Sequence, residues 1–362
     1  MKKRKNKSTK KKDDIFYKYK PIEENNFFFI HFLKVLLLVL ILFLYRLSYS
    51  RKNNTINIIN KNELELNNIN NKNEKKFQYF CCYCTMGREE NIYVKELIEY
   101  YSNLGVEKFI IGDNNLINTE KFSDILKDFI NNGTVDIINI IGNSISQSTF
   151  YGNVYDKYKS KCEWFTFFDF DEYLIMHFDK EKNLTIKEYI SNQIFNKCEA
   201  ILFNWLIYTD NNLLYYDNRT LLERFTIPDF SNINNMYVKS MIRGNINKVA
   251  FEPGKTHHHP NKELIICDSM GEKIDDPSET LHPPRFKYAY LMHFNTKTAE
   301  EFAKKIKKGN LDNHPNENIE GKIDLFFSIN NFTKEKLEIF EKIFNQTFEK
   351  YHNKYIYKEN KR

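Results

Sequence analysis

The chain has 362 residues, enough for one large domain or two small ones with an ample core. Its 54 Lys and Arg against 48 Asp and Glu give a formal charge of +6, but residues 1–20 alone carry ten Lys/Arg and only two Asp. The rest of the chain is therefore slightly acidic, which argues against a nucleic-acid-binding surface on its folded part.

The first 75 residues predict a membrane anchor and a linker. Residues 1–26 form a basic tail, and residues 27–45 are mostly apolar, close to the ~20 residues that a helix needs to span a bilayer. The basic flank places the tail in the cytoplasm, and no small-residue cleavage site follows the apolar run. Residues 46–75 are polar and Asn-rich, as in a stem. We expect an uncleaved signal anchor of a single-pass type II membrane protein.

Alternating strands and helices are expected from residue 76 onward. Apolar runs predict strands at 77–85, 106–111, 135–141 and 164–168, with helices at 91–104, 122–130 and 151–161 between them. This alternation predicts an α/β domain with a mostly parallel sheet flanked by helices, a nucleotide-binding fold by default. Further strands are expected at 200–208, 221–227 and 288–294, and a helix at 299–308. The domain would span 76–330, and 331–362 would be a C-terminal helix and polar tail.

Six cysteines are distributed along the domain without the two-pair spacing of a zinc finger. Cys81, Cys82 and Cys84 crowd one apolar strand, where we expect small buried hydrophobic residues. A disulfide among Cys162, Cys198 and Cys267 would be compatible with an oxidising compartment, but the sequence cannot pair them.

Two aspartates follow the strand at 164–168 directly, with Phe170 between them. Residues i and i+2 of an extended chain point the same way, so Asp169 and Asp171 would share one face. Adjacent carboxylates repel unless a proton or a cation lies between them. The carboxyl end of a buried strand in an open α/β sheet is also where ligands bind. We expect a divalent cation shared with a phosphorylated ligand; the alternative is ordinary loop carboxylates.

Four blocks occur in order and carry a resemblance to a known family. They are 84–90 with Tyr93 and Glu96; 105–115; 147–173; and Lys239-Ser240 through His257 with His293, Phe302, Lys305 and Gly309. In this order they resemble glycosyltransferase family 92 and its bacterial relatives of the family 2 type. The resemblance implies a Rossmann-like GT-A fold and inverting transfer of a hexose, galactose by family analogy, from a UDP-sugar to a glycan. It also implies Mn²⁺ or Mg²⁺ as cofactor and a catalytic domain in the Golgi lumen.

The resemblance also implies roles for individual residues. Asp171 would bind the metal directly, Asp169 would bind the ribose or the metal, and His257 and His293 match family histidines that complete the metal site. Base, ribose and diphosphate would contact Thr85, Arg88, Glu90 and Asp113. Their alternatives are structural: Asp113 as a turn residue, Glu90 as a charge at a helix N-terminus, and the histidines as core or surface residues.

An inverting transferase needs a general base that deprotonates the acceptor hydroxyl. Asp210, Glu223 and Asp229 all follow the acidic pair in the sequence. We favour Asp210, because it follows an aromatic strand at a loop where an acceptor could dock, with Glu223 as the alternative.

Two other functions remain compatible with the sequence. One is a catalytically inactive membrane protein of the same fold that binds sugar nucleotides or glycans. Leu97 and Tyr101 favour it slightly, since the family usually has Trp and His there. The other is a metal-dependent phosphohydrolase using Asp169, Asp171 and the histidines, although the chain lacks an H-E-x-x-H motif.

Overall fold

The computed structural model describes residues 77–141, 145–178, 183–247, 264–276, 281–309 and 318–356. The expected tail, anchor and stem (1–75) and His257 lie outside these ranges. Among the helices that the structure does describe, none is long and apolar enough to cross a bilayer.

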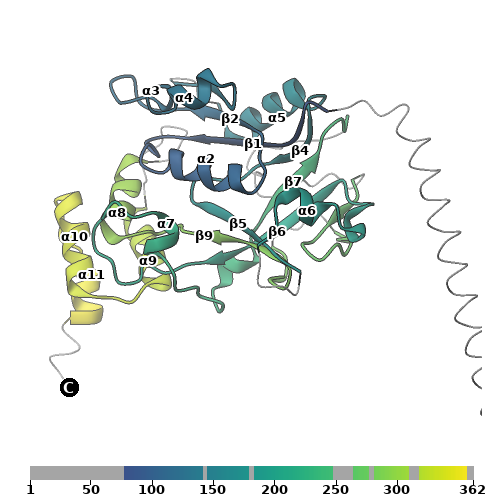
Figure 1. Ribbon diagram of the computed structural model, residues 1–362. Coiled ribbons are helices and arrows are strands. Elements are labelled where there is room, and N and C mark those ends of the chain that lie inside the picture. Colours follow the sequence, from purple (N-terminus) through teal and green to yellow (C-terminus); the bar gives the residue numbers. More distant parts are fainter. Residues whose placement is uncertain are drawn as a thin grey trace, which may run out of the picture. The chain divides into compact units, whose positions relative to one another are not determined.

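A mixed sheet of nine strands forms the centre of the domain (Figure 1). The strand order is β3-β2-β1-β4-β7-β6-β9-β5, with β8 paired to β6. Their bounds are β1 (Tyr79–Gly87), β2 (Lys108–Asp113), β3 (Val135–Asn139), β4 (Cys162–Thr166), β5 (Glu172–Met176), β6 (Ala200–Ile207), β7 (Val238–Arg243), β8 (Ile266–Cys267) and β9 (Ala289–His293). Only β5 and β7 run against the other strands. The expected α/β architecture with a large central sheet is confirmed.

Helices cover both faces of the first half of the sheet. Along β1, Cys81 and Tyr83 pack on one side with α2, whereas Cys82 and Cys84 pack on the other side with α5. This alternation is the period of two that an extended strand imposes, so β1 is buried on both faces. The helices are α2 (Val94–Asn103), α3 (Phe122–Ile125), α4 (Lys127–Asn131), α5 (Gln147–Tyr158), α6 (Ile186–Ile190), α7 (Leu221–Arg224), α8 (Ala299–Lys308), α9 (Ile319–Ile329), α10 (Lys334–Phe344) and α11 (Glu349–Tyr351). Short 3-10 segments lie at Gln193–Phe195 and Ile233–Met236, and a π-helical segment lies at His352–Ile356.

One expected strand is a helix instead. Residues 221–227 begin with α7, because the Thr220 side chain accepts the Glu223 N–H and the Glu223 carboxylate accepts the Thr220 N–H. This capping box satisfies the free N–H groups at the start of a helix, and it outweighs the apolar run that suggested a strand.

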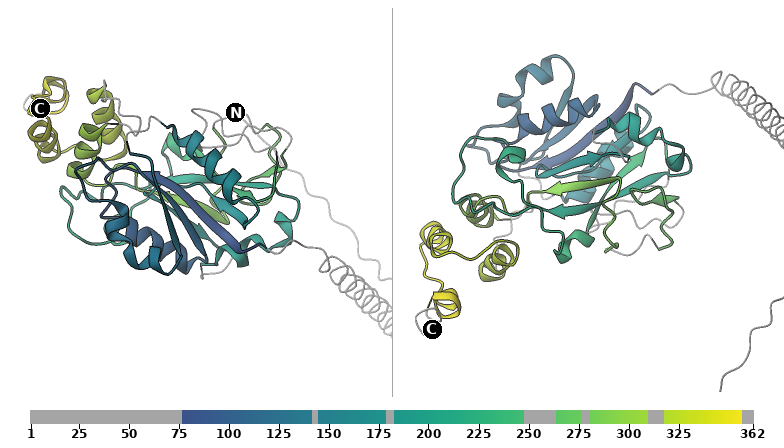
Figure 2. Two further views of the ribbon diagram at one scale, coloured as in Figure 1. Left: turned by 90° about the horizontal axis from the view of Figure 1, so that it is seen from above. Right: turned by 60° about the horizontal axis from the view of Figure 1, so that its bottom comes forward.

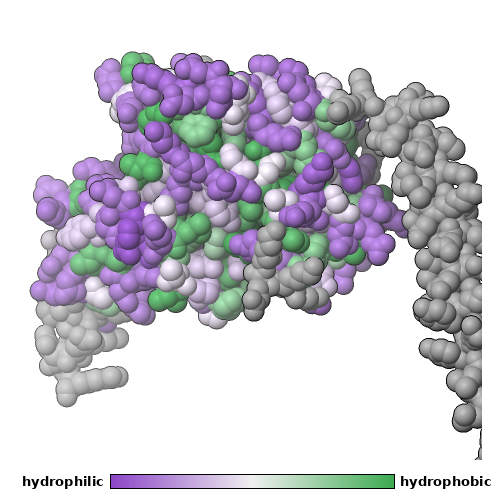
Figure 3. All heavy atoms as spheres, in the orientation of Figure 1, coloured by the Kyte–Doolittle hydropathy of each residue, from purple (hydrophilic) through white to green (hydrophobic). Residues whose placement is uncertain are grey.

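Helices α8 to α11 form a second layer with its own apolar core, which includes Phe302, Phe326 and Phe340. Figure 2 shows these helices grouped at one end of the sheet. Figure 3 shows hydrophilic side chains over most of one face of the molecule, with apolar side chains in small groups between them.

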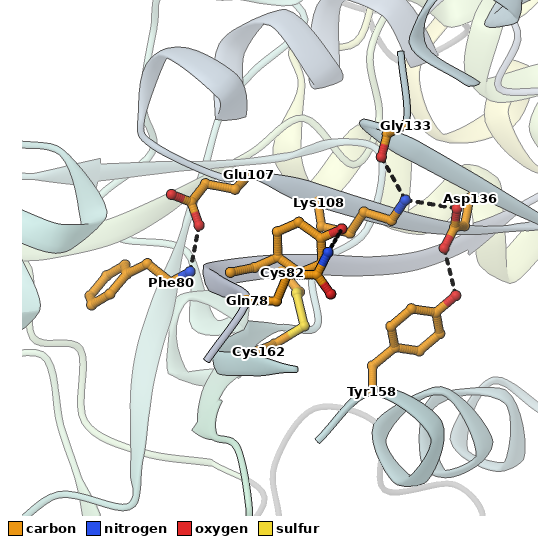
Figure 4. Close-up of a disulfide and its surroundings, with 10 residues drawn as sticks. Gln78, Phe80, Cys82, Glu107, Lys108, Gly133, Asp136, Tyr158 and Cys162 are labelled. Atoms are coloured by element: carbon orange, nitrogen blue, oxygen red, sulfur yellow. Dashed lines mark hydrogen bonds and ion pairs between the residues drawn. A yellow bond between two sulfur atoms is a disulfide. The ribbon is translucent and has the colours of Figure 1, made fainter. Parts of the chain in front are cut away.

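Two disulfides cross-link the domain. Cys82 on β1 joins Cys162 on β4 (Figure 4), and Cys198 joins Cys267 on β8. Cys81 and Cys84 are buried thiols, as expected, but Cys82 is a disulfide partner rather than a simple apolar residue. Disulfides form and persist mainly in oxidising compartments.

Candidate active site

A cavity of about 290 Å³ lies where β1 and the acidic loop after β4 meet α8 and α9. Three carboxylates line it, namely Glu90, Asp169 and Asp171. Four cationic side chains also line it, namely Arg88, Lys305, Lys308 and Lys322. The acidic pair therefore lies at a concave site, and positive charge balances it there.

Asp169 is held by a buried lysine. The Lys239 Nζ on β7 lies 2.7 Å from the Asp169 Oδ2, and the Gln147 Nε2 donates to its Oδ1 at 2.7 Å. The Asp169 N–H donates to the Glu172 Oε2 at 2.8 Å. Lys239 is fully buried, whereas the Asp169 side chain is about one-third exposed at the cavity. Lys239 and Gln147 thus hold the Asp169 carboxylate in place, while part of it remains open to the cavity.

Asp171 faces three nitrogen groups. The Lys305 Nζ donates to its Oδ2 at 3.1 Å, the Lys297 Nζ lies 3.9 Å from that oxygen, and the His293 Nε2 lies 3.6 Å from Oδ1. Burial raises the pKa of Asp171, but Lys305, Lys297 and His293 outweigh burial and hold that pKa well below its usual range. Asp171 is therefore a carboxylate at any physiological pH.

Phe170 packs the acidic loop, residues 167–171 between β4 and β5, against the end of β1. Its ring packs on Phe122 with centroids 5.4 Å apart. A Cβ on Gly87 would come within 2.5 Å of the Phe170 ring, so only glycine allows this approach.

A divalent cation fits beside Asp171 only if a ligand completes its coordination. In the described ranges, no three His, Cys, Asp or Glu side chains converge on one point. Asp171 and His293 do form a pair whose facing atoms are 3.6 Å apart. Two donors that each lie about 2.1 Å from one ion are about 3 to 4 Å apart, so this pair matches that spacing. Burial lowers the pKa of His293, which keeps its ring neutral and able to donate a lone pair.

The residues expected to bind the donor separate into two groups. Arg88 and Glu90 line the cavity, and Glu90 lies 3.4 Å from the Lys297 Nζ and 3.5 Å from the Lys308 Nζ. Thr85 and Asp113 are buried and do not line it. The Asp113 carboxylate accepts the backbone N–H groups of Asn115 and Phe122, which is the turn role considered as its alternative.

Neither expected general base reaches the cavity. Asp210 is buried and its Oδ2 lies 2.6 Å from the Lys336 Nζ of α10. Glu223 caps α7, and Asp229 accepts hydrogen bonds from Ser231. In the structure each of these three carboxylates is engaged by a nearby donor.

Leu97 and Tyr101 lie in the core rather than at the cavity. The Tyr101 hydroxyl donates to the Glu172 carbonyl at 2.8 Å and accepts the Leu174 N–H at 3.0 Å. Neither residue lines the cavity, and Tyr101 instead supports β5.

Sequence reasoning gave no individual role to the lysines around the acidic pair, although Lys239 and Lys305 belong to the fourth block. Lys239 interrupts an apolar strand, and this interruption, with its place in the fourth block, was the available signal of a buried charge. Lys297 is buried with a backbone φ of 51°, and its Nζ lies 4.2 Å from the centre of the Tyr93 ring. A non-glycine residue in this left-handed conformation is typical of functional sites, but no local pattern predicts it.

We expect Glu172 to make stability fall with rising pH. Burial raises the pKa of Glu172 to about 8, against the opposing attraction of Lys239. The unfolded carboxyl loses its proton near 4.5, so the folded state holds one more proton between those values. The stabilising contribution is complete below the unfolded pKa and is lost as the pH rises through the folded pKa.

Urea unfolding between about pH 5 and about pH 8 measures this dependence. Glu172→Gln cannot titrate and should flatten the fall in the free energy of unfolding. An equally steep fall in the glutamine variant would show that another group carries the proton.

The family model described as Glycosyltransferase family 92 matches residues 77–324. A Glycosyltransferase family 92 protein of Oryza sativa subsp. japonica is 28% identical over an alignment of 134 residues, and the match covers 34% of this chain and 20% of that protein. The match thus spans about one-fifth of the relative's length.

Two solved structures show a weak likeness. The crystal structure of S. aureus TarS has 12% identity and a TM-score of 0.33, covering 75% of this chain and 51% of that one. The structure of S. aureus TarS 1-349 has 11% identity and a TM-score of 0.31, covering 74% of this chain and 71% of that one.

Proposed function

Because the chain belongs to glycosyltransferase family 92, we propose that it transfers a sugar from a donor bound in the cavity beside Asp171. We propose further that it is a GT-A enzyme that moves a hexose, by family analogy galactose, from a UDP-sugar to a glycan with inversion. The observation that carries it is the cavity itself, where the buried Asp171, the partly exposed Asp169 and four cationic side chains meet at the strand ends.

The cationic side chains give the cavity affinity for a diphosphate. Lys305, Lys308 and Arg88 line one continuous space with Asp171. Negative charge grows on the diphosphate as it leaves the sugar, and fixed positive groups in a partly buried site stabilise that charge. The apolar side chains of Phe170 and Phe302 line the same cavity and would limit water around the reacting atoms.

We propose Mn²⁺ or Mg²⁺ as the cofactor, with Asp171 and His293 as its protein ligands. Mg²⁺ sites commonly combine one or two protein ligands with the phosphates of the substrate. The cation would neutralise the departing diphosphate. Asp171 stays ionised because of its cationic neighbours, and burial keeps His293 neutral, so both side chains are in the protonation state that a ligand needs.

The proposed location is the lumen of the secretory pathway, in the Golgi, behind an N-terminal anchor at residues 27–45. Two disulfides in the domain support an oxidising compartment. The basic tail before the apolar run supports a cytoplasmic N-terminus.

A donor screen tests the proposed function. Full-length protein in detergent, with Mn²⁺ and a set of glycan acceptors, should release UDP from one UDP-sugar in a panel and extend an acceptor in step. Tight UDP binding without any UDP release, in protein shown to be folded, would instead identify a binding protein of the same fold.

A further inference from the structure

We propose that Lys305 is a displaceable counter-ion of Asp171, and this inference rests on the proposed function. Lys305 would hold the carboxylate while the site is empty of cation and donor. When both arrive, its ammonium group would leave Asp171 to the cation and turn to the diphosphate.

Lys305 differs in exposure from the other lysines near the acidic pair. Its side chain is 38% exposed, whereas those of Lys297 and Lys239 are 5% and 0% exposed. The exposed chain can change conformation without opening the core, and the buried chains cannot.

The contact of Lys305 with Asp171 is also longer than that of Lys239 with Asp169. The Lys305 Nζ lies 3.1 Å from the Asp171 Oδ2, 3.3 Å from the Asn295 carbonyl and 3.4 Å from the Asn295 Oδ1. Lys239 lies at 2.7 Å from its carboxylate. Charge-assisted hydrogen bonds are strongest near the shorter distance. Lys305 therefore loses less interaction energy on leaving Asp171 than Lys239 would lose on leaving Asp169.

The side chain can turn while its backbone stays fixed. Helix α8 is capped by Thr298 and Glu301, and its Phe302, Ala303 and Ile306 are buried. Lys305 lines the cavity beside Asp171 and also a neighbouring cavity of about 160 Å³. It therefore lies between two spaces into which the ammonium group can rotate.

Repulsion from the cation and attraction to the diphosphate determine where the Lys305 ammonium group moves. A divalent cation on Asp171 would lie close to an ammonium group that now contacts the same carboxylate, and like charges at such a distance repel strongly in a buried site. Lys297 stays in place, because Glu90 and Asp171 hold it and raise its pKa against the effect of burial. The diphosphate gives Lys305 a new anionic partner, so cation and nucleotide should strengthen each other's binding by the same factor.

Binding of Mn²⁺ alone, followed by the electron paramagnetic resonance signal of the free ion, tests this exchange. In full-length protein we expect UDP to tighten Mn²⁺ binding about tenfold or more. Lys305→Met should bind Mn²⁺ about tenfold more tightly than wild type without UDP, and UDP should then add less. Lys307→Met removes the same charge from the exposed side of α8 and should match wild type. Lys305→Arg keeps the charge and should also remain close to wild type.

The possible results separate the inference from the proposed function. Equal Mn²⁺ affinity of wild type and Lys305→Met without UDP, while UDP still strengthens both, would overturn the exchange and leave the metal site standing. No Mn²⁺ binding by wild type even with UDP would remove the metal from the proposed function and the exchange with it. Melting temperatures of all variants confirm that the comparison is between folded proteins.

Discussion

Asp171→Asn is expected to lower the rate of glycosyl transfer by about 10²- to 10³-fold, the loss typical when a preorganised charge is removed from a reaction centre. The substitution keeps the shape of the side chain but removes the charge that Lys305, Lys297 and His293 face. In the proposed reaction it also removes the one buried carboxylate that can hold the cation. The loss should appear in kcat more than in KM, measured as UDP release under saturating donor.

A matched control separates this effect from a general loss of charge. Asp156 on α5 is 72% exposed and pairs with Lys159, so Asp156→Asn removes the same charge from the surface. It should keep wild-type activity. Transfer by folded Asp171→Asn at nearly the wild-type rate would exclude Asp171 from the chemistry, whatever its position in the cavity.

The first half of the fold was predictable because its information is local. Strands β1 to β4 are apolar runs separated by helices, and the connection between successive parallel strands follows from that order. The place of Asp169 and Asp171 at a cavity was predictable for the same reason, since both follow directly from a buried strand. By contrast, α7 begins an apolar run that favours a strand, and the capping box of Thr220 and Glu223 makes it a helix instead.

The partners of buried charges could not be predicted, because they come from distant parts of the chain. Asp171 and Asp210 both follow a strand and look alike in the sequence. Folding brings the partly exposed Lys305 to the first and the buried Lys336 to the second, and of these two aspartates only Asp171 lines the cavity. The disulfides show the same limit, since they join cysteines 80 and 69 residues apart.

Asp210, in the loop after β6, and Lys336, on α10, form a buried ion pair that joins the sheet to the C-terminal helices. The two side chains are 2% and 0% exposed and lie 2.6 Å apart. Around them, the Asp210 N–H donates to the Asn330 Oδ1, and the Lys336 Nζ donates to the Asn331 carbonyl at 2.9 Å. Such a pair is costly to break on one side, because the remaining charge stays buried without its counter-ion.

Asp210→Asn should therefore lower the free energy of unfolding by about 3 to 5 kcal/mol, with a lower urea midpoint. Lys336→Met should cost a similar amount, and the double variant less than the sum of the two, because it leaves no unpaired charge. The folded fraction of Asp210→Asn should keep transfer activity close to wild type, since Asp210 does not line the cavity. A general base would behave in the opposite way: its asparagine variant would unfold like wild type and lose turnover. Stability and activity measured on the same variant thus decide whether this carboxylate holds the fold together or takes the acceptor's proton.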